Sequence, residues 1–351
     1  MLSDTQHMST ESNTLEYADL DALDISRLND LQGKQELASQ VLSFVNKNGF
    51  FYVKGHGLTG PDQATIQYWK RALQPSTRGE LRCIANTEAG DFRGYKPRST
   101  GELEARDNDE RYNIPKFTPE HERSHPKPIQ DHFDEIKEFS LHVHNQVLLP
   151  LLRLFAYVLE IDEDYFVSRH RYEARALGYL RYMKYFPRTE AEDAAVNNTW
   201  AKDHTDYNTL TFLLHQPVSG LQIQTPEGWK YVKSFEDTII VNVADTLEFS
   251  SGGYLKSTVH RVIRPPPDQA DKPRLGLIYF ARPEADVEIA PVKSPLLQRL
   301  GLQSSTEDVP RGVTAEGWAR ARIAKDHRFR TGLDERREGE IIAGVHQKFY
   351  D

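Results

Sequence analysis

The feature that most restricts the possible fold is a series of short, β-rich runs between residues 177 and 282. Runs of β-branched and aromatic residues are separated there by turn signals such as Pro217-Val-Ser-Gly220 and Pro226-Glu-Gly228. Several short strands at regular spacing, with turns between them, indicate an antiparallel sandwich or barrel. The sequence therefore predicts a mainly β core that can bring residues far apart in the chain to one mouth.

A histidine and an aspartate stand two residues apart within this region, as His204 and Asp206. On a strand, residues i and i+2 share one face, so the imidazole and the carboxylate can point at one position. His260, in a later alternating run, is the best third partner, and two imidazoles with one carboxylate form the facial triad that binds ferrous iron. His215 lies outside any such spacing and is not expected to bind metal.

Five stretches follow one another along the chain and carry further information. They are Gly49-Phe-Phe-Tyr-Val-Lys-Gly-His-Gly57, Lys184-Tyr-Phe-Pro187, His204-Thr-Asp206, Gly253-Tyr-Leu-Lys-Ser-Thr-Val-His-Arg-Val262, and Arg274-Leu-Gly276 with Phe280 after it. Together they resemble the non-haem Fe(II), 2-oxoglutarate-dependent dioxygenases, in the branch that includes isopenicillin N synthase and the plant flavonoid and hormone dioxygenases. The segment after residue 282 looks most like fungal members of that family.

The resemblance implies a mainly β fold with flanking helices. Its core is expected to be a double-stranded β-helix, or jelly roll, with an N-terminal α/β region and a C-terminal helix. Apolar residues at helical spacing predict helices within residues 35–47 and 128–160. We expect four segments: a mobile tail at residues 1–14, a helical and β region that packs on the core at 15–160, the oxygenase jelly roll at 161–285, and a C-terminal helical extension at 286–351.

The resemblance also assigns roles to residues near the expected metal centre. It implies that His204, Asp206 and His260 are the Fe(II) ligands. It further implies that Arg274 holds the distal carboxylate of 2-oxoglutarate, because a planar guanidinium gives two parallel hydrogen bonds to a carboxylate. The serine that accompanies this arginine in the family is replaced here by Gly276.

In relatives, two further residues contact the co-substrate, and their positions correspond to Lys184 and Phe186 in this sequence. Strict alternation along the strand at residues 177–187 places Tyr182, Lys184 and Phe186 on one face, which looks inward in the family. Lys184 would then pair with an anion such as the co-substrate, because an unpaired buried charge is costly. Tyr182, Phe186 and Phe280 are predicted to line the substrate pocket. A one-residue shift of the strand that turns Lys184 to solvent is the alternative.

The chemistry that the resemblance implies is oxidation of a small molecule. With Fe(II), 2-oxoglutarate and O2, an enzyme of this family hydroxylates, desaturates or cyclises its substrate and releases succinate and CO2. We expect a role in secondary metabolism. One alternative is an Fe(II) oxidase of the same fold that does not use 2-oxoglutarate, which the departures at Gly276 and Phe186 keep open. The other is a non-catalytic, metal- or ligand-binding jelly roll, which a complete triad disfavours.

Composition bounds the partners and the compartment. The net charge of -8 argues against nucleic acid as a partner. No apolar run approaches the ~18 residues that a membrane span needs, and no secretory signal peptide is recognisable, so we expect a cytoplasmic protein. A single cysteine, Cys83, rules out an intramolecular disulfide. The sequence indicates neither the substrate nor an oligomeric state.

Overall fold

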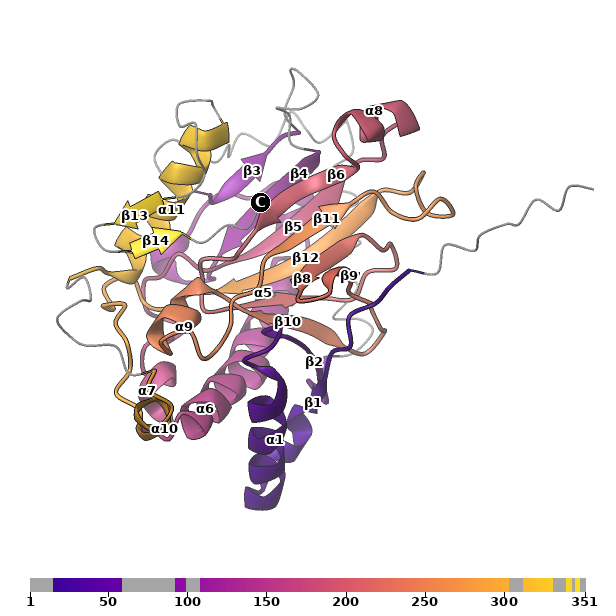
Figure 1. Cartoon of the computed structure of the whole chain (residues 1–351). Helices are drawn as coiled ribbons and strands as arrows, with labels where there is room; N and C mark the ends of the chain where they lie inside the picture. Colours follow the sequence, from indigo (N-terminus) through magenta and orange to yellow (C-terminus); the bar gives the residue numbers. More distant parts are fainter. Residues whose placement is uncertain are drawn as a thin grey trace, which may run out of the picture.

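Two β-sheets that face each other form the centre of the molecule (Figure 1). The structure is a computed structural model that describes residues 15–58, 92–98, 108–302, 312–330, 339–342 and 345–347. Side chains from both sheets meet between them, as Met183, Tyr185, Trp200 and Val262 do. The tail expected at residues 1–14 lies outside the described residues.

The larger sheet contains eight of the described strands, and the smaller one contains four. Neighbouring strands within these sheets are antiparallel except for the pair β1 and β2. In spatial order the larger sheet is β1 (Ala22–Asp24), β2 (Phe50–Lys54), β10 (Ile239–Val243), β7 (Leu210–Leu213), β12 (Arg274–Ala281), β5 (Tyr179–Tyr185), β4 (Asp109–Pro115) and β3 (Gly94–Lys96). The smaller sheet is β6 (Thr199–His204), β11 (His260–Ile263), β8 (Leu221–Thr225) and β9 (Gly228–Tyr231).

The path of the chain between the two sheets is that of a jelly roll. From β5 to β12 the chain passes repeatedly from the larger sheet to the smaller one and back, and only β8 and β9 follow each other in the same sheet. The predicted jelly-roll core is therefore confirmed. The first four strands, which precede residue 160, extend the larger sheet, so the N-terminal region shares a sheet with the jelly roll.

Both faces of the larger sheet are buried, because side chains alternate along a strand and each face has its own covering. Phe212 and Tyr279 point outward into the core that lies under the helices. Leu213 and Ile278, their neighbours along the chain, point inward toward the smaller sheet. The candidate metal ligands described below lie on this inner side.

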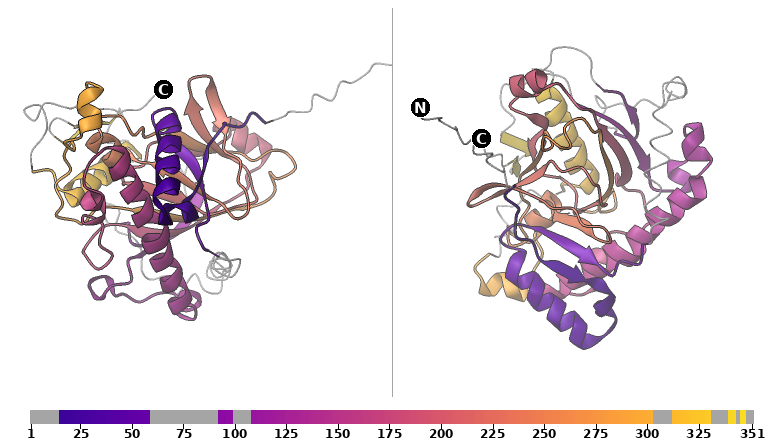
Figure 2. Two further views of the ribbon diagram at one scale, coloured as in Figure 1. Left: turned by 90° about the horizontal axis from the view of Figure 1, so that it is seen from below. Right: turned by 90° about the vertical axis from the view of Figure 1, so that its right-hand side faces the viewer.

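Helices cover the outer face of the larger sheet, as Figure 2 shows. They are α1 (Leu31–Phe44), α5 (Phe133–His142), the π-helical turn η4 (Val143–Leu148) and α6 (Leu149–Val158). The last three form the long helical stretch predicted within residues 128–160. Helix α1 begins earlier than predicted because the Asp30 side chain caps it, accepting a hydrogen bond from the Gly33 amide.

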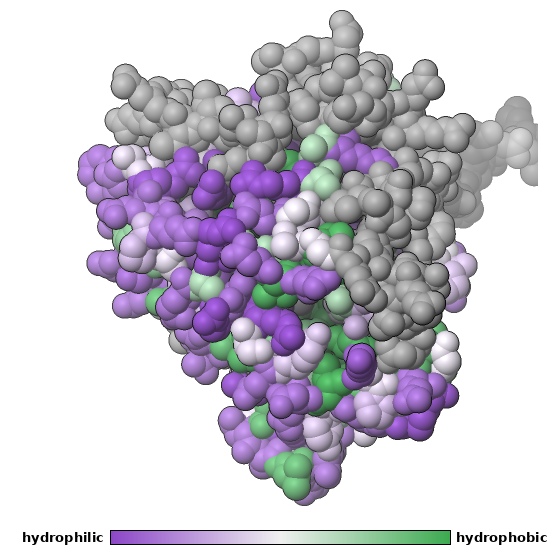
Figure 3. Space-filling model, turned by 90° about the vertical axis from the view of Figure 1, so that its left-hand side faces the viewer, coloured by the Kyte–Doolittle hydropathy of each residue, from purple (hydrophilic) through white to green (hydrophobic). Residues whose placement is uncertain are grey.

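The remaining elements connect or flank the sheets. They are η1 (Ile25–Asn29), η3 (Pro119–His121), α4 (Lys127–Gln130), α7 (Asp164–Val167), α8 (Glu190–Ala195), α9 (Asp245–Ser250), α10 (Pro295–Arg299), α11 (Ala315–Arg330), β13 (Gly339–Ile342) and β14 (Val345–Gln347). The expected C-terminal helix is α11. On the face in Figure 3, hydrophilic residues predominate and hydrophobic ones form small separate groups. Among the described helices, none is long and apolar enough to cross a membrane.

Candidate metal centre

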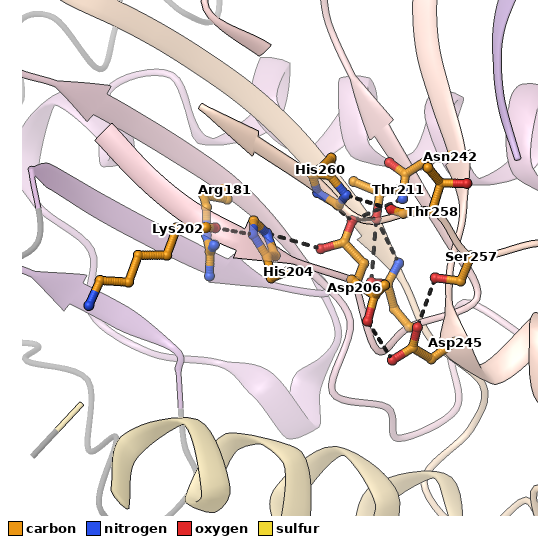
Figure 4. A network of polar contacts seen from close by, with 12 residues as sticks. Arg181, Lys202, His204, Asp206, Thr211, Asn242, Asp245, Ser257, Thr258 and His260 are labelled. Carbon is orange, nitrogen blue, oxygen red and sulfur yellow. Dashed lines mark hydrogen bonds and ion pairs between the residues drawn. The ribbon is translucent and has the colours of Figure 1, made fainter. Parts of the chain in front are cut away.

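His204, Asp206 and His260 converge at one point between the sheets (Figure 4). One potential ligand atom from each lies within 4.8 Å of the other two. The Nε2 atom of His204 is 3.9 Å from Asp206 Oδ1, and the Nε2 atom of His260 is 3.8 Å from Asp206 Oδ2. His204 and His260 are directly opposite each other on β6 and β11. Strand β6 ends at His204, so Asp206 reaches the site from the following turn rather than from a shared strand face.

Backbone carbonyls orient both imidazoles. His204 Nδ1 is 2.8 Å from the Lys202 carbonyl oxygen, and His260 Nδ1 is 3.1 Å from that of Thr258. Because a carbonyl only accepts hydrogen bonds, each Nδ1 carries the proton and donates it. In the neutral imidazole each Nε2 then carries the lone pair and faces Asp206, which is the tautomer of histidine that binds a metal through Nε2.

The carboxylate of Asp206 is buried but well supported. Thr211 Oγ1 donates a hydrogen bond of 2.6 Å to Asp206 Oδ2, and Asn242 Nδ2 donates one of 3.0 Å to the same oxygen. Burial raises the pKa of Asp206, yet the electrostatic interactions with His260 and His204 and these two hydrogen bonds hold the pKa below its usual value. Asp206 is therefore an ionised ligand, and two imidazoles with one carboxylate are the donor set that suits ferrous iron.

A second group of polar residues fixes the turn that carries Asp206. The Asp245 amide donates to the Asp206 carbonyl oxygen at 2.8 Å. The Asp245 carboxylate accepts hydrogen bonds from Thr205 and Ser257, and it forms an ion pair of 2.8 Å with Arg322. Arg322 belongs to α11, so the C-terminal helix supports the metal centre from outside the jelly roll.

We expect the hydrogen bonds to Asp206 to contribute to metal affinity. Thr211→Val or Asn242→Ala should weaken Fe(II) binding about 10–100-fold, the effect typical of residues that orient a metal ligand. Anaerobic Fe(II) titration would measure it, with Thr238→Val as a control, because buried Thr238 donates to the Phe235 carbonyl oxygen instead. Wild-type affinity in both variants would show that Asp206 does not need this support.

Arg274 lies on the inner face of β12, opposite Tyr185 on β5. It is only 4% exposed, and no carboxylate of the described residues lies within 4.0 Å of it, including exposed Asp271. Its Nε has no hydrogen-bond partner among the described residues. Burial lowers the pKa of Arg274 to about 10, so the side chain stays charged at neutral pH. A buried, unpaired guanidinium is suited to the carboxylate of a bound ligand.

Gly276 also faces inward, opposite Met183. A Cβ atom added at Gly276 would lie 3.9 Å from Ile278 and Met183, which is ordinary van der Waals contact. We therefore expect Gly276→Ser to fold normally and to leave the KM for 2-oxoglutarate unchanged or lower it up to about tenfold, since one hydrogen bond contributes roughly 0.5–1.5 kcal/mol. Steady-state kinetics would test this. A large rise in KM would indicate that the co-substrate does not lie beside residue 276.

The expected inward orientation of Tyr182 and Lys184 is wrong. Tyr182 is fully buried in the outer core beneath the helices, and Lys184 shares this outer face. Phe186 follows β5, and its ring centroid lies 4.8 Å from Lys184 Nζ, so Phe186 accompanies Lys184 rather than Arg274. The inward residues of β5 include Arg181 and Tyr185. Tyr182 packs outward because its large ring fills the space between sheet and helices, which shifts the inward set by one residue.

Phe280 does face inward, as predicted. It lies opposite Thr211 on one side and Tyr179 on the other. Its ring centroid is 5.0 Å from that of Tyr179 and 4.8 Å from Arg181 Cζ. Because Thr211 donates to Asp206, Phe280 is one strand away from the metal centre. Its role toward a substrate stays a prediction.

The site contains functional residues that sequence reasoning missed. Among them, Asn242 had a detectable signal, since it is polar within the apolar run Ile239–Val243. Asp245 and Arg322 had none, because they are distant in sequence and meet only in the folded chain. Tyr185, rather than Tyr182, is the tyrosine that faces Arg274.

Comparison with known proteins gives concordant similarities. A sequence profile of the 2OG-Fe(II) oxygenase superfamily matches residues 178–283, and one described as the N-terminal part of non-haem dioxygenases in morphine synthesis matches residues 20–134. The chain is 30% identical over 292 residues to the 2-oxoglutarate-dependent dioxygenase frbH of Dothideomycetidae sp., covering 78% of this chain and 85% of that one. It is 27% identical over 348 residues to the 2-oxoglutarate-dependent dioxygenase gloE of Glarea lozoyensis, covering 95% and 96%. The structure of Neurospora crassa T7H with alpha-KG and thymine is similar at a TM-score of 0.72 and 24% identity, covering 88% of this chain and 97% of that one.

Proposed function

The chain belongs to the 2OG-Fe(II) oxygenase superfamily, and from this we propose that it hydroxylates, desaturates or cyclises a small organic molecule of secondary metabolism. It is an Fe(II)/2-oxoglutarate-dependent dioxygenase. When bound, the iron couples the conversion of 2-oxoglutarate to succinate and CO2 with oxidation of a substrate C–H bond by O2. The small-molecule assignment is supported by the similarity to T7H, whose structure contains thymine.

We assign metal binding to His204, Asp206 and His260. One ligand atom of each residue lies within 4.8 Å of the other two, and three such ligands would leave the remaining coordination positions of Fe(II) for a 2-oxo acid and O2. The lone pairs on both Nε2 atoms are held in place by the Nδ1 hydrogen bonds described above. The fold therefore holds both imidazoles with Nε2 turned toward the metal position.

We assign the distal carboxylate of 2-oxoglutarate to Arg274. The surrounding side chains of Met183, Tyr185, Trp200 and Val262 exclude water from this end of the interior, which strengthens an ion pair there. Tyr185 lies opposite Arg274 and can supply the hydroxyl that Gly276 lacks. The single observation that carries the proposal is this unpaired arginine, buried in the same interior as a complete triad.

The same observation, together with the similar proteins, answers the two alternatives considered from the sequence. An Fe(II) oxidase that does not use 2-oxoglutarate would need the acid of a substrate to neutralise Arg274, which has no carboxylate partner among the described residues, whereas the similar proteins gloE and frbH are 2-oxoglutarate-dependent dioxygenases. A non-catalytic, metal- or ligand-binding jelly roll is disfavoured because gloE and frbH, which are similar over most of this chain, are dioxygenases. Neither alternative is therefore proposed.

The proposal can be tested without knowing the substrate. Anaerobic titration of the Fe(II)-loaded protein with 2-oxoglutarate should produce the weak visible absorption band of a bidentate 2-oxo acid complex. Adding O2 should then yield succinate, and a substrate from a panel of small molecules should accelerate this. Substrate oxidation at full rate with no 2-oxo acid and no succinate would overturn the proposal in favour of the oxidase.

A further inference from the structure

A second pair of buried arginines lies on the inner face of the larger sheet, away from Arg274. Arg181 is on β5, and Arg282 follows the last residue of β12. Arg181 is 8% exposed and Arg282 is 5% exposed. The Cζ atoms of Arg181 and Arg282 are 5.1 Å and 5.2 Å from the ring centroid of Tyr179, so one tyrosine ring lies beside both guanidinium groups.

Neither guanidinium is neutralised within the described part of the protein. Arg181 donates to the Asn113 side-chain oxygen at 2.8 Å and to the Tyr179 hydroxyl at 3.0 Å, and both acceptors are uncharged. Arg282 Nε and Nη1 have no hydrogen-bond partner among the described residues. Asp109 interacts electrostatically with Arg181, but its carboxylate is paired with Arg111 at 3.2 Å.

A third arginine in this region, Arg322, is neutralised by a carboxylate and serves for comparison. Arg322 and Arg282 both approach the ring of Tyr207. The Cζ atom of Arg322 is 5.8 Å from the ring centroid, and that of Arg282 is 4.6 Å from it. Arg322, however, forms an ion pair with Asp245 at 2.8 Å. The absence of such a partner therefore distinguishes Arg181 and Arg282 from a structural arginine in the same surroundings, and leaves two positive charges beside one tyrosine ring without a counterion among the described residues.

These two arginines adjoin the metal centre. Arg181 Cζ lies 4.8 Å from the ring of Phe280, the residue opposite Thr211, and Thr211 donates to Asp206. Arg282 contacts the ring of Tyr207, which follows Asp206 in the chain. In Figure 4 the guanidinium of Arg181 lies on the His204 side of the triad. A ligand between the two arginines would therefore lie next to the bound metal.

This position differs from that of the co-substrate carboxylate. Arg274 and Arg282 are eight residues apart along one extended run, which corresponds to about 26 Å at ~3.3 Å per residue. A single molecule of 2-oxoglutarate is far too short to contact both. Arg274 therefore serves one anion, and the pair formed by Arg181 and Arg282 is available for another.

We propose that Arg181 and Arg282 bind a carboxylate group of the substrate, so that the enzyme oxidises a small carboxylic acid. Both guanidinium groups lie against aromatic rings, and Nε and Nη1 of Arg282, which have no partner among the described residues, can donate in-plane hydrogen bonds to a planar carboxylate. Phe280 and Tyr179 would pack against the apolar part of the acid. This inference rests on the proposed function and names the substrate class for it.

Calorimetry on the full-length protein, loaded anaerobically with Fe(II) and saturating 2-oxoglutarate, would test the inference. The probes are a panel of small aromatic and aliphatic carboxylic acids, each compared with its uncharged primary amide. We expect at least one acid to bind at least tenfold more tightly than its amide. Arg181→Leu and Arg282→Leu should each reduce the affinity for that acid at least tenfold, whereas binding of the amide should change little.

The controls separate this inference from folding and from the proposed function. Arg261 also lies on an aromatic ring, with its Cζ atom 4.0 Å from the centroid of Trp229, but it faces away from the interior. The Arg261→Leu variant should therefore still bind the acid more tightly than the amide. If the leucine variants fail to fold, Arg181→Lys and Arg282→Lys replace them in the test, because lysine keeps the positive charge but lacks the planar guanidinium. No acid preference in the wild type, or a preference that survives both leucine changes, would overturn the inference. If the Fe(II)-loaded wild-type protein did not bind 2-oxoglutarate, the proposed function itself would be rejected.

Discussion

Asp206→Ala is expected to abolish turnover and to weaken Fe(II) binding by more than the ~10–100-fold typical of residues that only orient a ligand. The change removes the one carboxylate of the triad and leaves two neutral imidazoles facing the metal position. His204→Ala and His260→Ala should have the same consequence, because each removes an Nε2 ligand. Anaerobic Fe(II) titration and succinate formation would measure the two effects.

The folded state should survive these changes, because the main core lies on the other side of the larger sheet, under the helices. Thermal unfolding followed by circular dichroism should therefore show a cooperative transition in every variant. His215→Ala is the matched control, since its imidazole contacts the Ser234 hydroxyl at 3.0 Å and does not belong to the triad. Retained activity in any of the three triad variants would refute the metal assignment.

Arg274→Leu should raise the KM for 2-oxoglutarate far more than the KM for the substrate. Removing one partner of a buried, charged hydrogen-bonded pair costs about 2–5 kcal/mol, which corresponds to a loss of at least about 30-fold in affinity. In the absence of 2-oxoglutarate the same change should leave thermal stability unchanged or higher, because leucine replaces a buried charge that has no carboxylate partner among the described residues. If Arg274 binds the co-substrate, its replacement should weaken 2-oxoglutarate binding without lowering the thermal stability of the protein free of 2-oxoglutarate.

The pH dependence of co-substrate affinity provides a second measurement on Arg274. Burial lowers its pKa to about 10, so 2-oxoglutarate affinity should be constant near neutral pH and should fall as the pH rises through that value. Lys184→Met is the control, because Lys184 lies on the outer face of the sheet with Tyr182 and should not alter the KM for 2-oxoglutarate. If Lys184→Met raised this KM and Arg274→Leu did not, the two residues would have been assigned to the wrong faces.

Local sequence determined the strands of the jelly roll and the metal triad. Short β-rich runs with turns between them indicated the strands, and His204, Asp206 and His260 are chemically distinctive residues in a recognisable order. The inward orientation of Arg274 and Phe280 was also predictable, because alternation along β12 places them on one face and the resemblance to the dioxygenases implies that this face holds the co-substrate.

Only the tertiary structure decided the orientation of β5 and the residues that meet across the fold. Alternation divides a strand into two faces, but both faces of the larger sheet are buried, so Tyr182 and Tyr185 are equally apolar candidates for the interior. The helices take Tyr182 into the outer core, and this turns Arg181 and Tyr185 toward the metal. The ion pair of Asp245 with Arg322 likewise joins residues far apart in the chain. Such contacts depend on the packing of whole layers, which no local pattern of residues encodes.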